Sequence, residues 1–275
     1  MTNEKLRALQ HKELEITREI LRVCREHHLQ CYAAYGTLLG AVRHNGFIPW
    51  DDDVDLWMPR RDYETFLSIA PKLLPHPYEA QTHQSCQNDE VYTARVIDTS
   101  TRVRVCTGKE PVEQCVWVDL WALDGMPEGK LSASIHKLRL LFARMLVQLS
   151  VYRRLVHQYR KNRPFHEKAI MAVCERIDFS RVIRTKPAKA RVERLMAKYD
   201  PESCSHIVSF WSEEKFAGIM PRSWFQRTDF LPFEDISIPV PGEYKAILRH
   251  FYGDYLQLPP ESQRDIQHKM EILDI

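Results

Sequence analysis

The chain lacks the features of secreted, membrane-spanning and zinc-binding proteins. Its 275 residues contain no run near the roughly 18 apolar residues that a membrane span requires. The charged start, MTNEKLRALQHKELE, has no apolar signal-peptide core. Its seven cysteines are scattered and include no CxxC pair, which disfavours a zinc site and a disulfide framework. Repeats and low-complexity linkers are absent too. We therefore expect a globular protein of the reducing cytoplasm.

Charge is present but unevenly placed. Residues 130–200 hold 18 Lys or Arg and five Asp or Glu, although the whole chain has a net charge of only +2. This segment predicts a surface for an anionic partner, either an acidic lipid-linked glycan or the inner membrane face, with the protein peripheral to the membrane. A solvated basic face is the alternative. Nothing resembles a base-reading module, so we expect no nucleic-acid partner.

Hydrophobic spacing predicts an α+β protein with a mixed sheet and flanking helices. Apolar periods near 3.6 indicate helices, and alternation rich in Val, Tyr and Trp indicates strands. We expect helices over 4–28, 38–44, 60–74, 131–161, 166–177, 187–199 and 241–251, and strands over 31–35, 53–58, 91–97, 115–122, 206–210 and 236–240. The chain then divides into an α+β core over 1–130, a basic helical region over 131–205, and a segment over 206–275 that packs back on the core.

An acidic cluster at 51–55 is the most informative stretch. Its sequence is Asp-Asp-Asp-Val-Asp, and repulsion between like charges makes it a poor folding element. Because side chains alternate along a strand, Asp53 and Asp55 point to one face. Two such carboxylates favour Mg²⁺ or Mn²⁺, which prefer oxygen ligands. Asp51 is expected in the entry turn, and Asp52 is expected to point away. The alternative is a solvated acidic loop.

A glycine turn precedes this cluster. Gly36 and Thr37 would let backbone N–H groups and a hydroxyl approach a phosphate, with Thr37 capping the next helix. Arg43 and His44 end that helix and could reach a diphosphate. Alone, a Gly-Thr pair is more often an ordinary turn. Followed 16 residues later by Asp-Val-Asp-Leu, it matches the nucleotidyltransferase pattern.

That pattern requires a third carboxylate from a neighbouring strand. Asp119 is the lone acid of the apolar strand over 115–122. A buried, unpaired aspartate is costly, so a metal ion or a substrate proton would explain it. A cap or turn position is the alternative for Asp119. Asp124, which precedes a glycine, is expected to form a turn.

Longer motifs resemble a known family. They are YGTLLGAVRH at 35–44, GFIPWDDDVD at 46–55, VDL and LDG at 118–125, IPVPG at 238–242 and YGDY at 252–255. Together they resemble the LicD family, which includes bacterial phosphocholine transferases and is related to the fukutin-type proteins. The likeness spans most of the chain and is weakest over 131–200. Trp121-Ala122 stands where the family more usually has an aromatic-Pro pair, which leaves Asp119 aligned.

The resemblance implies a fold, a reaction and a site. The fold would be the nucleotidyltransferase fold with a helical, basic insertion. The reaction would move phosphocholine from CDP-choline, or another CDP-linked group, to a glycan hydroxyl and release CMP. Asp53, Asp55 and Asp119 would be the catalytic and metal-binding carboxylates, with Mg²⁺ or Mn²⁺ as cofactor. Gly36, Thr37, Arg43 and His44 are the expected substrate contacts.

Two other functions use the same residues. A nucleotidyltransferase in the strict sense would move NMP from NTP to an acceptor, and a binding module would carry a degenerate site. Choline would need an aromatic cage. Five tryptophans are available, but the sequence does not choose among Trp50, Trp57, Trp117, Trp121 and Trp224. Arg95 is a candidate donor contact, although a surface ion pair is expected for it.

Overall fold

The computed structural model describes residues 2–86, 91–106, 111–155, 176, 178–212, 214–264 and 270–275. The helix predicted over 166–177 lies outside this part, apart from residue 176. The helices are α1 (Asn3–Glu26), α2 (Tyr35–His44), α3 (Arg60–Leu73), α4 (Lys130–Leu155), α6 (Thr185–Met196) and α7 (Tyr244–Tyr252). The strands are β1 (Tyr32–Ala33), β2 (Asp55–Pro59), β3 (Tyr78–Gln81), β4 (Ala94–Val105), β5 (Val112–Met126), β6 (His206–Val208), β7 (Met220–Pro221), β8 (Thr228–Phe233), β9 (Ile236–Pro241) and β10 (Met270–Asp274).

Eight of these strands form one mixed sheet. Its central order is β1-β2-β5-β4-β10, with β3 paired to β4, β6 to the end of β5, and β7 to β6. Strands β2 and β5 run parallel, whereas β4 and β5 run antiparallel. Strands β8 and β9 form a separate hairpin. The predicted α+β class is confirmed, and the mixed sheet with its flanking helices is nucleotidyltransferase-like.

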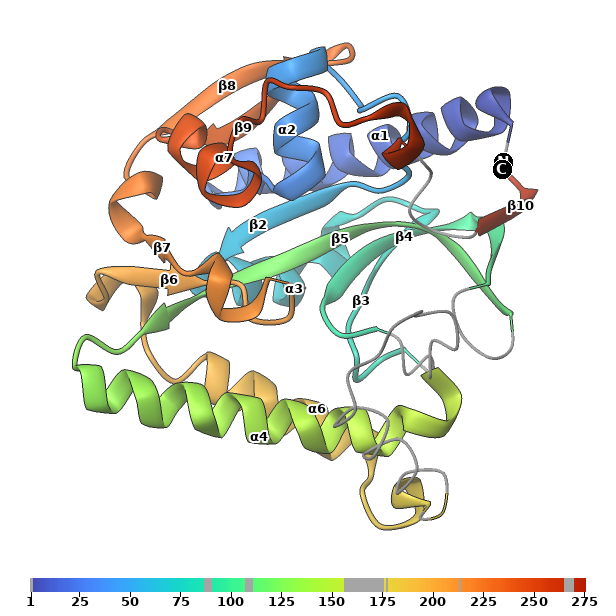
Figure 1. Cartoon of the computed structure of the whole chain (residues 1–275). Helices are drawn as coiled ribbons and strands as arrows, with labels where there is room; N and C mark the ends of the chain where they lie inside the picture. Colours follow the sequence, from blue (N-terminus) through green and yellow to red (C-terminus); the bar gives the residue numbers. More distant parts are fainter. Residues whose placement is uncertain are drawn as a thin grey trace.

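Helix α1 supplies much of the core that packs against this sheet. Leu9, Ile16, Ile20 and Val23 recur at helical spacing and are fully buried. Burial of each such side chain contributes about 1.5–3 kcal/mol. Helix α1 contacts β4, β5 and α3. Helices α2 and α7 and the β8–β9 hairpin lie together on the side of the molecule opposite α4 and α6 (Figure 1).

Helices α4 and α6 pack side by side around a second, smaller core (Figure 1). Leu140 and Val147 of α4 meet Val192 of α6 and Phe210 within it. The helices predicted over 131–161 and 187–199 thus exist with shifted limits, and the end of the first lies outside the described residues. Within the described part of the chain, no helix combines the length and the apolar character needed to cross a membrane.

A buried ion network joins the helical layer to the sheet. The Arg60 guanidinium donates to both carboxylate oxygens of Asp124, with Nε–Oδ1 at 2.6 Å and Nη2–Oδ2 at 2.7 Å. It also contacts Glu193 of α6 at 3.1 Å. The prediction that Asp124 forms a turn was wrong, because β5 continues to Met126 and pairs there with β6.

The segment around the acidic cluster also differs from expectation. Strand β1 spans only two residues, because it pairs with only Leu56 and Trp57 of β2. Helix α2 begins at Tyr35, earlier than predicted. Thr37 therefore lies inside the helix and does not cap it. Strand β2 begins at Asp55, so Asp53 precedes the strand that was expected to contain it.

Candidate active site

A row of charged side chains crosses three neighbouring strands. Asp55 of β2 is in register with Asp119 of β5, and Asp119 is in register with Arg95 of β4. Residues in register on adjacent strands lie on the same face and about 4.5–5.5 Å apart. Two of the three predicted carboxylates are therefore neighbours across the sheet, with an arginine beside them.

This row lies in a cavity of about 470 Å³. Asp53, Asp55 and Asp119 all line it, as do Gly36 and Arg95. The remaining lining is acidic or aromatic over much of its extent, and it includes Asp51, Glu214, Tyr35, Tyr92, Trp117, Trp121 and Tyr252. The structure therefore brings the three predicted acids and the glycine of the preceding turn to one cavity.

Two tryptophans orient the carboxylates. Trp121 Nε1 donates to Asp55 Oδ1 at 2.6 Å, and Trp117 Nε1 donates to Asp119 Oδ2 at 2.8 Å. Trp117, Asp119 and Trp121 alternate along β5, so strand geometry places all three on one face. The pairing of indole and carboxylate is a feature that the sequence analysis missed, although the alternation W-V-D-L-W is visible in the sequence.

The backbone of Asp55 is also held in place. Its N–H donates to Thr37 Oγ1 at 2.9 Å, and its carbonyl accepts from the N–H of Ala34 at 3.0 Å. Thr37 is buried and is not part of the cavity lining. In this structure its hydroxyl positions a carboxylate-bearing strand, whereas contact of Thr37 with a phosphate stays a prediction.

Burial, followed by repulsion between neighbouring acids, perturbs the carboxyl groups of the cavity. Desolvation raises the pKa of Asp55 well above its usual range, and the charges of Asp53 and Asp119 raise it further. Glu13 of α1 is buried nearby. Burial raises the pKa of Glu13 well above its usual value, with further increments from Asp53 and Asp52. Sequence analysis missed Glu13, since it lies in the middle of an ordinary amphipathic helix.

These acids have the chemistry of a site for a hard divalent cation. Carboxylate oxygens are the ligands that Mg²⁺ and Mn²⁺ prefer, and a cation would offset the burial and the repulsion that raise the pKa of Asp55. Among the described residues, no three His, Cys, Asp or Glu side chains are already grouped closely enough to ligate one ion. The carboxylates are of the ligand type that these cations prefer, and they share one cavity. Binding of Mg²⁺ or Mn²⁺ stays a prediction.

Arg95 occupies a different place from the one expected. It is 6% exposed, so the expectation of a surface ion pair was wrong. Its guanidinium lies 5.1 Å from the centre of the Trp117 ring and donates to Gln114 Oε1 at 2.8 Å. Burial on the central sheet, which no local motif indicated, brings this cation to the same row as Asp55 and Asp119.

Arg43 and His44 are placed away from this lining. They lie at the far end of α2 and are not among the residues of the cavity. Arg43 Nη1 donates to the carbonyl of Tyr255 at 3.2 Å, and the His44 ring lies edge-on to Trp50. Their predicted contact with a diphosphate remains untested by this geometry.

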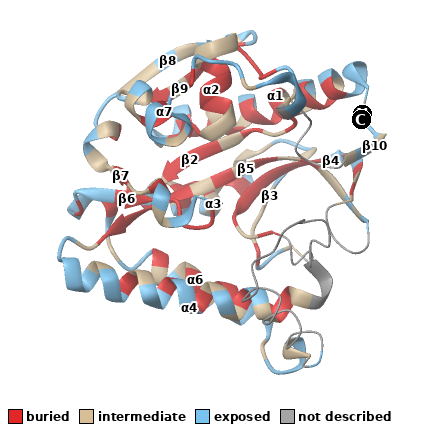
Figure 2. Ribbon diagram, in the orientation of Figure 1, coloured by how far each residue is buried: buried red, intermediate tan, exposed pale blue. Residues whose placement is uncertain are grey.

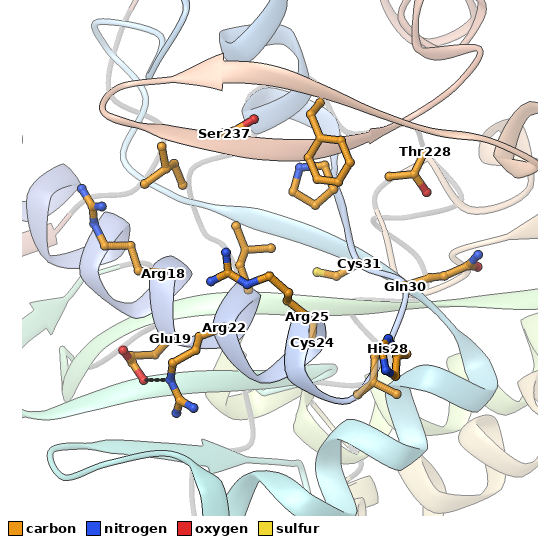
Figure 3. A pocket seen from close by; sticks show the side chains of 15 residues that line it. Arg18, Glu19, Arg22, Cys24, Arg25, His28, Gln30, Cys31, Thr228 and Ser237 are labelled. Atoms are coloured by element: carbon orange, nitrogen blue, oxygen red, sulfur yellow. Dashed lines mark hydrogen bonds and ion pairs between the residues drawn. The ribbon is translucent and has the colours of Figure 1, made fainter.

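A second cavity, of about 710 Å³, lies between α1 and the β8–β9 hairpin (Figure 3). Arg18, Arg22 and Arg25 line it, but Arg18 pairs with Asp235 and Arg22 with Glu19. None of the motif aspartates reaches it. We therefore assign the chemistry to the smaller acidic cavity.

The mixed sheet and its row of acids define a nucleotidyltransferase-like protein. Residues 28–124 match the family model described as the LicD/FKTN/FKRP nucleotidyltransferase domain. The chain is 27% identical over 257 residues to the lipopolysaccharide cholinephosphotransferase LicD of Haemophilus influenzae, covering 90% of each chain. An uncharacterized protein of Rickettsia typhi is 43% identical over 47 residues, which is 17% of this chain and 15% of that protein. Residues 28–124 therefore resemble the nucleotidyltransferase domain of the LicD family, and the likeness to LicD extends over most of the chain.

Proposed function

We propose that this protein transfers phosphocholine, or a similar phospho-substituent, from a CDP-linked donor to a hydroxyl of a cell-surface glycan and releases CMP. The observation that carries the proposal is the row Asp55–Asp119–Arg95 in one cavity with Asp53. The relative from Haemophilus influenzae, a lipopolysaccharide cholinephosphotransferase, supports choline and a glycan as the groups joined. CDP-choline is the first donor to test.

Four charged residues of the cavity have roles in this reaction. Asp119 accepts the proton of the glycan hydroxyl, whose oxygen forms a bond to the phosphorus that carries choline. The bond from that phosphorus to the bridging oxygen breaks, and CMP leaves. Arg95 faces the same row and stabilises negative charge on the phosphates. Asp53, Asp55 and Asp119 would hold Mg²⁺ or Mn²⁺, in one or two ions, which would neutralise diphosphate charge.

The aromatic lining suits the quaternary ammonium of choline. Such a cation cannot donate a hydrogen bond, so ring faces are its natural partners. The Tyr35 and Trp121 rings lie 6.1 Å apart in an edge-to-face arrangement within the lining. Other CDP-linked groups, such as glycerol or ribitol, would gain less from these rings.

The decisive assay measures which nucleotide product appears. The protein would be incubated with CDP-choline, CDP-glycerol, CDP-ribitol, ATP or CTP, together with lipopolysaccharide or other envelope glycans and Mg²⁺. We expect CMP from a CDP donor, with an acceptor-dependent rate. Pyrophosphate from ATP or CTP, without CMP from any CDP donor, would show an NMP-transferring enzyme instead.

A variant pair tests the assignment of the acids. Asp55→Asn removes a charge from the row, and we expect turnover to fall by about two or more orders of magnitude, as for the loss of a metal ligand. Asp229→Asn, outside the cavity, is the matched control and should retain the parent rate. Chelation by EDTA should abolish CMP release, and added Mg²⁺ or Mn²⁺ should restore it. Full turnover by Asp55→Asn would remove the basis of the assignment.

A further inference from the structure

Helix α4 has apolar side chains on two opposite sides. The inner side is buried: Leu140, Ala143 and Val147 pack against the core shared with α6, and Val151 continues the same helical spacing. The inner contacts account for the position of the helix. They do not account for the apolar residues on the other side, which we call the outer stripe.

The outer stripe consists of Leu131, Ile135, Leu138, Phe142 and Met145. The spacing i, i+4, i+7, i+11, i+14 places all five on one side of the helix, along about 21 Å at 1.5 Å per residue. Leu131 is 76% exposed and Leu138 is 69% exposed. Figure 2 shows the exposed residues distributed along α4.

A contiguous exposed stripe of this kind marks an interaction surface, whereas scattered apolar residues do not. Leu141, next to the stripe, is also exposed. Leaving these side chains in water forfeits the favourable free energy that their burial would give. A partner that covers α4 would recover it.

The charge of α4 indicates which kind of partner would cover the outer stripe. Helix α4 contains six Lys or Arg and no Asp or Glu. In the described part of the basic region the acids are Asp178, Glu193, Asp200 and Glu202, and Glu193 is engaged with Arg60 in the interior. A second copy docked through the same stripe would bring two positively charged helices together, which like-charge repulsion disfavours. An anionic surface with an apolar interior satisfies both the charges and the stripe.

We propose that the outer stripe of α4 docks the protein on an anionic membrane surface, with the helix axis parallel to the membrane plane. Apolar side chains enter the boundary between headgroups and acyl chains, and the exposed Lys130 and Arg139 beside them contact the phosphates. Such docking is independent of the chemistry in the acidic cavity. It would also hold the enzyme where lipid-linked acceptors are.

The test is flotation of the full chain with vesicles of phosphatidylglycerol and phosphatidylethanolamine, and with vesicles of phosphatidylcholine alone. We expect binding to the anionic vesicles that weakens as salt rises. The double variant Leu138→Gln/Phe142→Gln should lower the partition coefficient at least tenfold. Phe230→Gln is the matched control, because Phe230 is 64% exposed on β8, away from α4. Its binding should equal that of the parent.

A charge variant and two further measurements complete the test. Lys130→Gln/Arg139→Gln should weaken binding about tenfold and flatten its salt dependence. Circular dichroism melts should be unchanged, because all four altered positions are exposed. Equal binding by the stripe variant, equal binding to phosphatidylcholine, or no vesicle binding by the parent would overturn the proposal. So would a dimer in light scattering that the stripe variant converts to monomer, since the stripe would then serve a second copy.

Discussion

Asp124→Asn is expected to destabilise the protein far more than the loss of an exposed ion pair. Asp124 accepts two short hydrogen bonds from Arg60, and the two side chains are 2% and 9% exposed. Asparagine keeps the shape of the side chain but removes its charge and presents a single acceptor oxygen. Arg60 would then be a buried cation whose remaining acidic contact is Glu193 at 3.1 Å.

The magnitude follows from the burial of this pair. Removing one partner of a buried ion pair costs about 3–5 kcal/mol, because the other charge is left uncompensated. The remaining acceptor and Glu193 place the expected loss near the lower limit, at about 3 kcal/mol. For a chain of this size that loss lowers Tm by roughly 6–12 °C.

Urea unfolding followed by circular dichroism measures the difference in the free energy of unfolding. Asp235→Asn is the matched control, since Asp235 pairs with Arg18 but is 69% exposed, and solvent-exposed ion pairs contribute little to stability. The double variant Arg60→Met/Asp124→Leu should recover part of the loss, because it removes both charges. If Asp124→Asn cost no more than the control, the buried pair would not stabilise the fold as we infer.

Two further perturbations test the close packing of the acids and a buried histidine. In Gly36→Ala the new Cβ would lie 2.6 Å from Asp51 Oδ2. Because this would displace an acid of the cavity, we expect the rate of CMP release to fall at least about tenfold. Gly218→Ala, whose new Cβ has its nearest contact at 3.4 Å, is the control and should keep the parent rate. Burial, together with the charges of Lys189 and Lys186, lowers the pKa of His83 to about 4. The unfolded chain therefore binds a proton that the folded protein does not, and this contribution lowers stability as pH falls from about 6.5 toward 4. Urea midpoints at pH 7 and pH 4.5 should differ less for His83→Gln than for the parent, and an identical difference would contradict the assignment.

Local sequence was sufficient to predict a structural feature where a short motif defines both the backbone conformation and the side-chain chemistry. Strand positions predicted for Asp55 and Asp119 put these two acids on one face, as their register shows, whereas Asp53 precedes β2 and does not alternate within it. The structure places all three at one cavity. The helical periods of α1 and α3 were predicted to within two residues at each end, because a continuous apolar side requires no information from the rest of the chain.

Other features depend on contacts between distant segments. Glu13 is an ordinary helical position until α1 packs near the acidic cluster, and Arg95 resembles a surface residue until β4 pairs with β5. The short strand β3 and the terminal strand β10 were not predicted at all, because pairing with β4 rather than local preference defines them.

By itself, the sequence indicated the resemblance to the LicD family, the three candidate carboxylates and the basic character of the middle region, since each is visible in short stretches of sequence. Only the tertiary structure decided which residues surround those carboxylates, which ion pairs are buried and which side of α4 remains exposed. Strand register and helix docking set these properties, and both join segments that are far apart in the sequence.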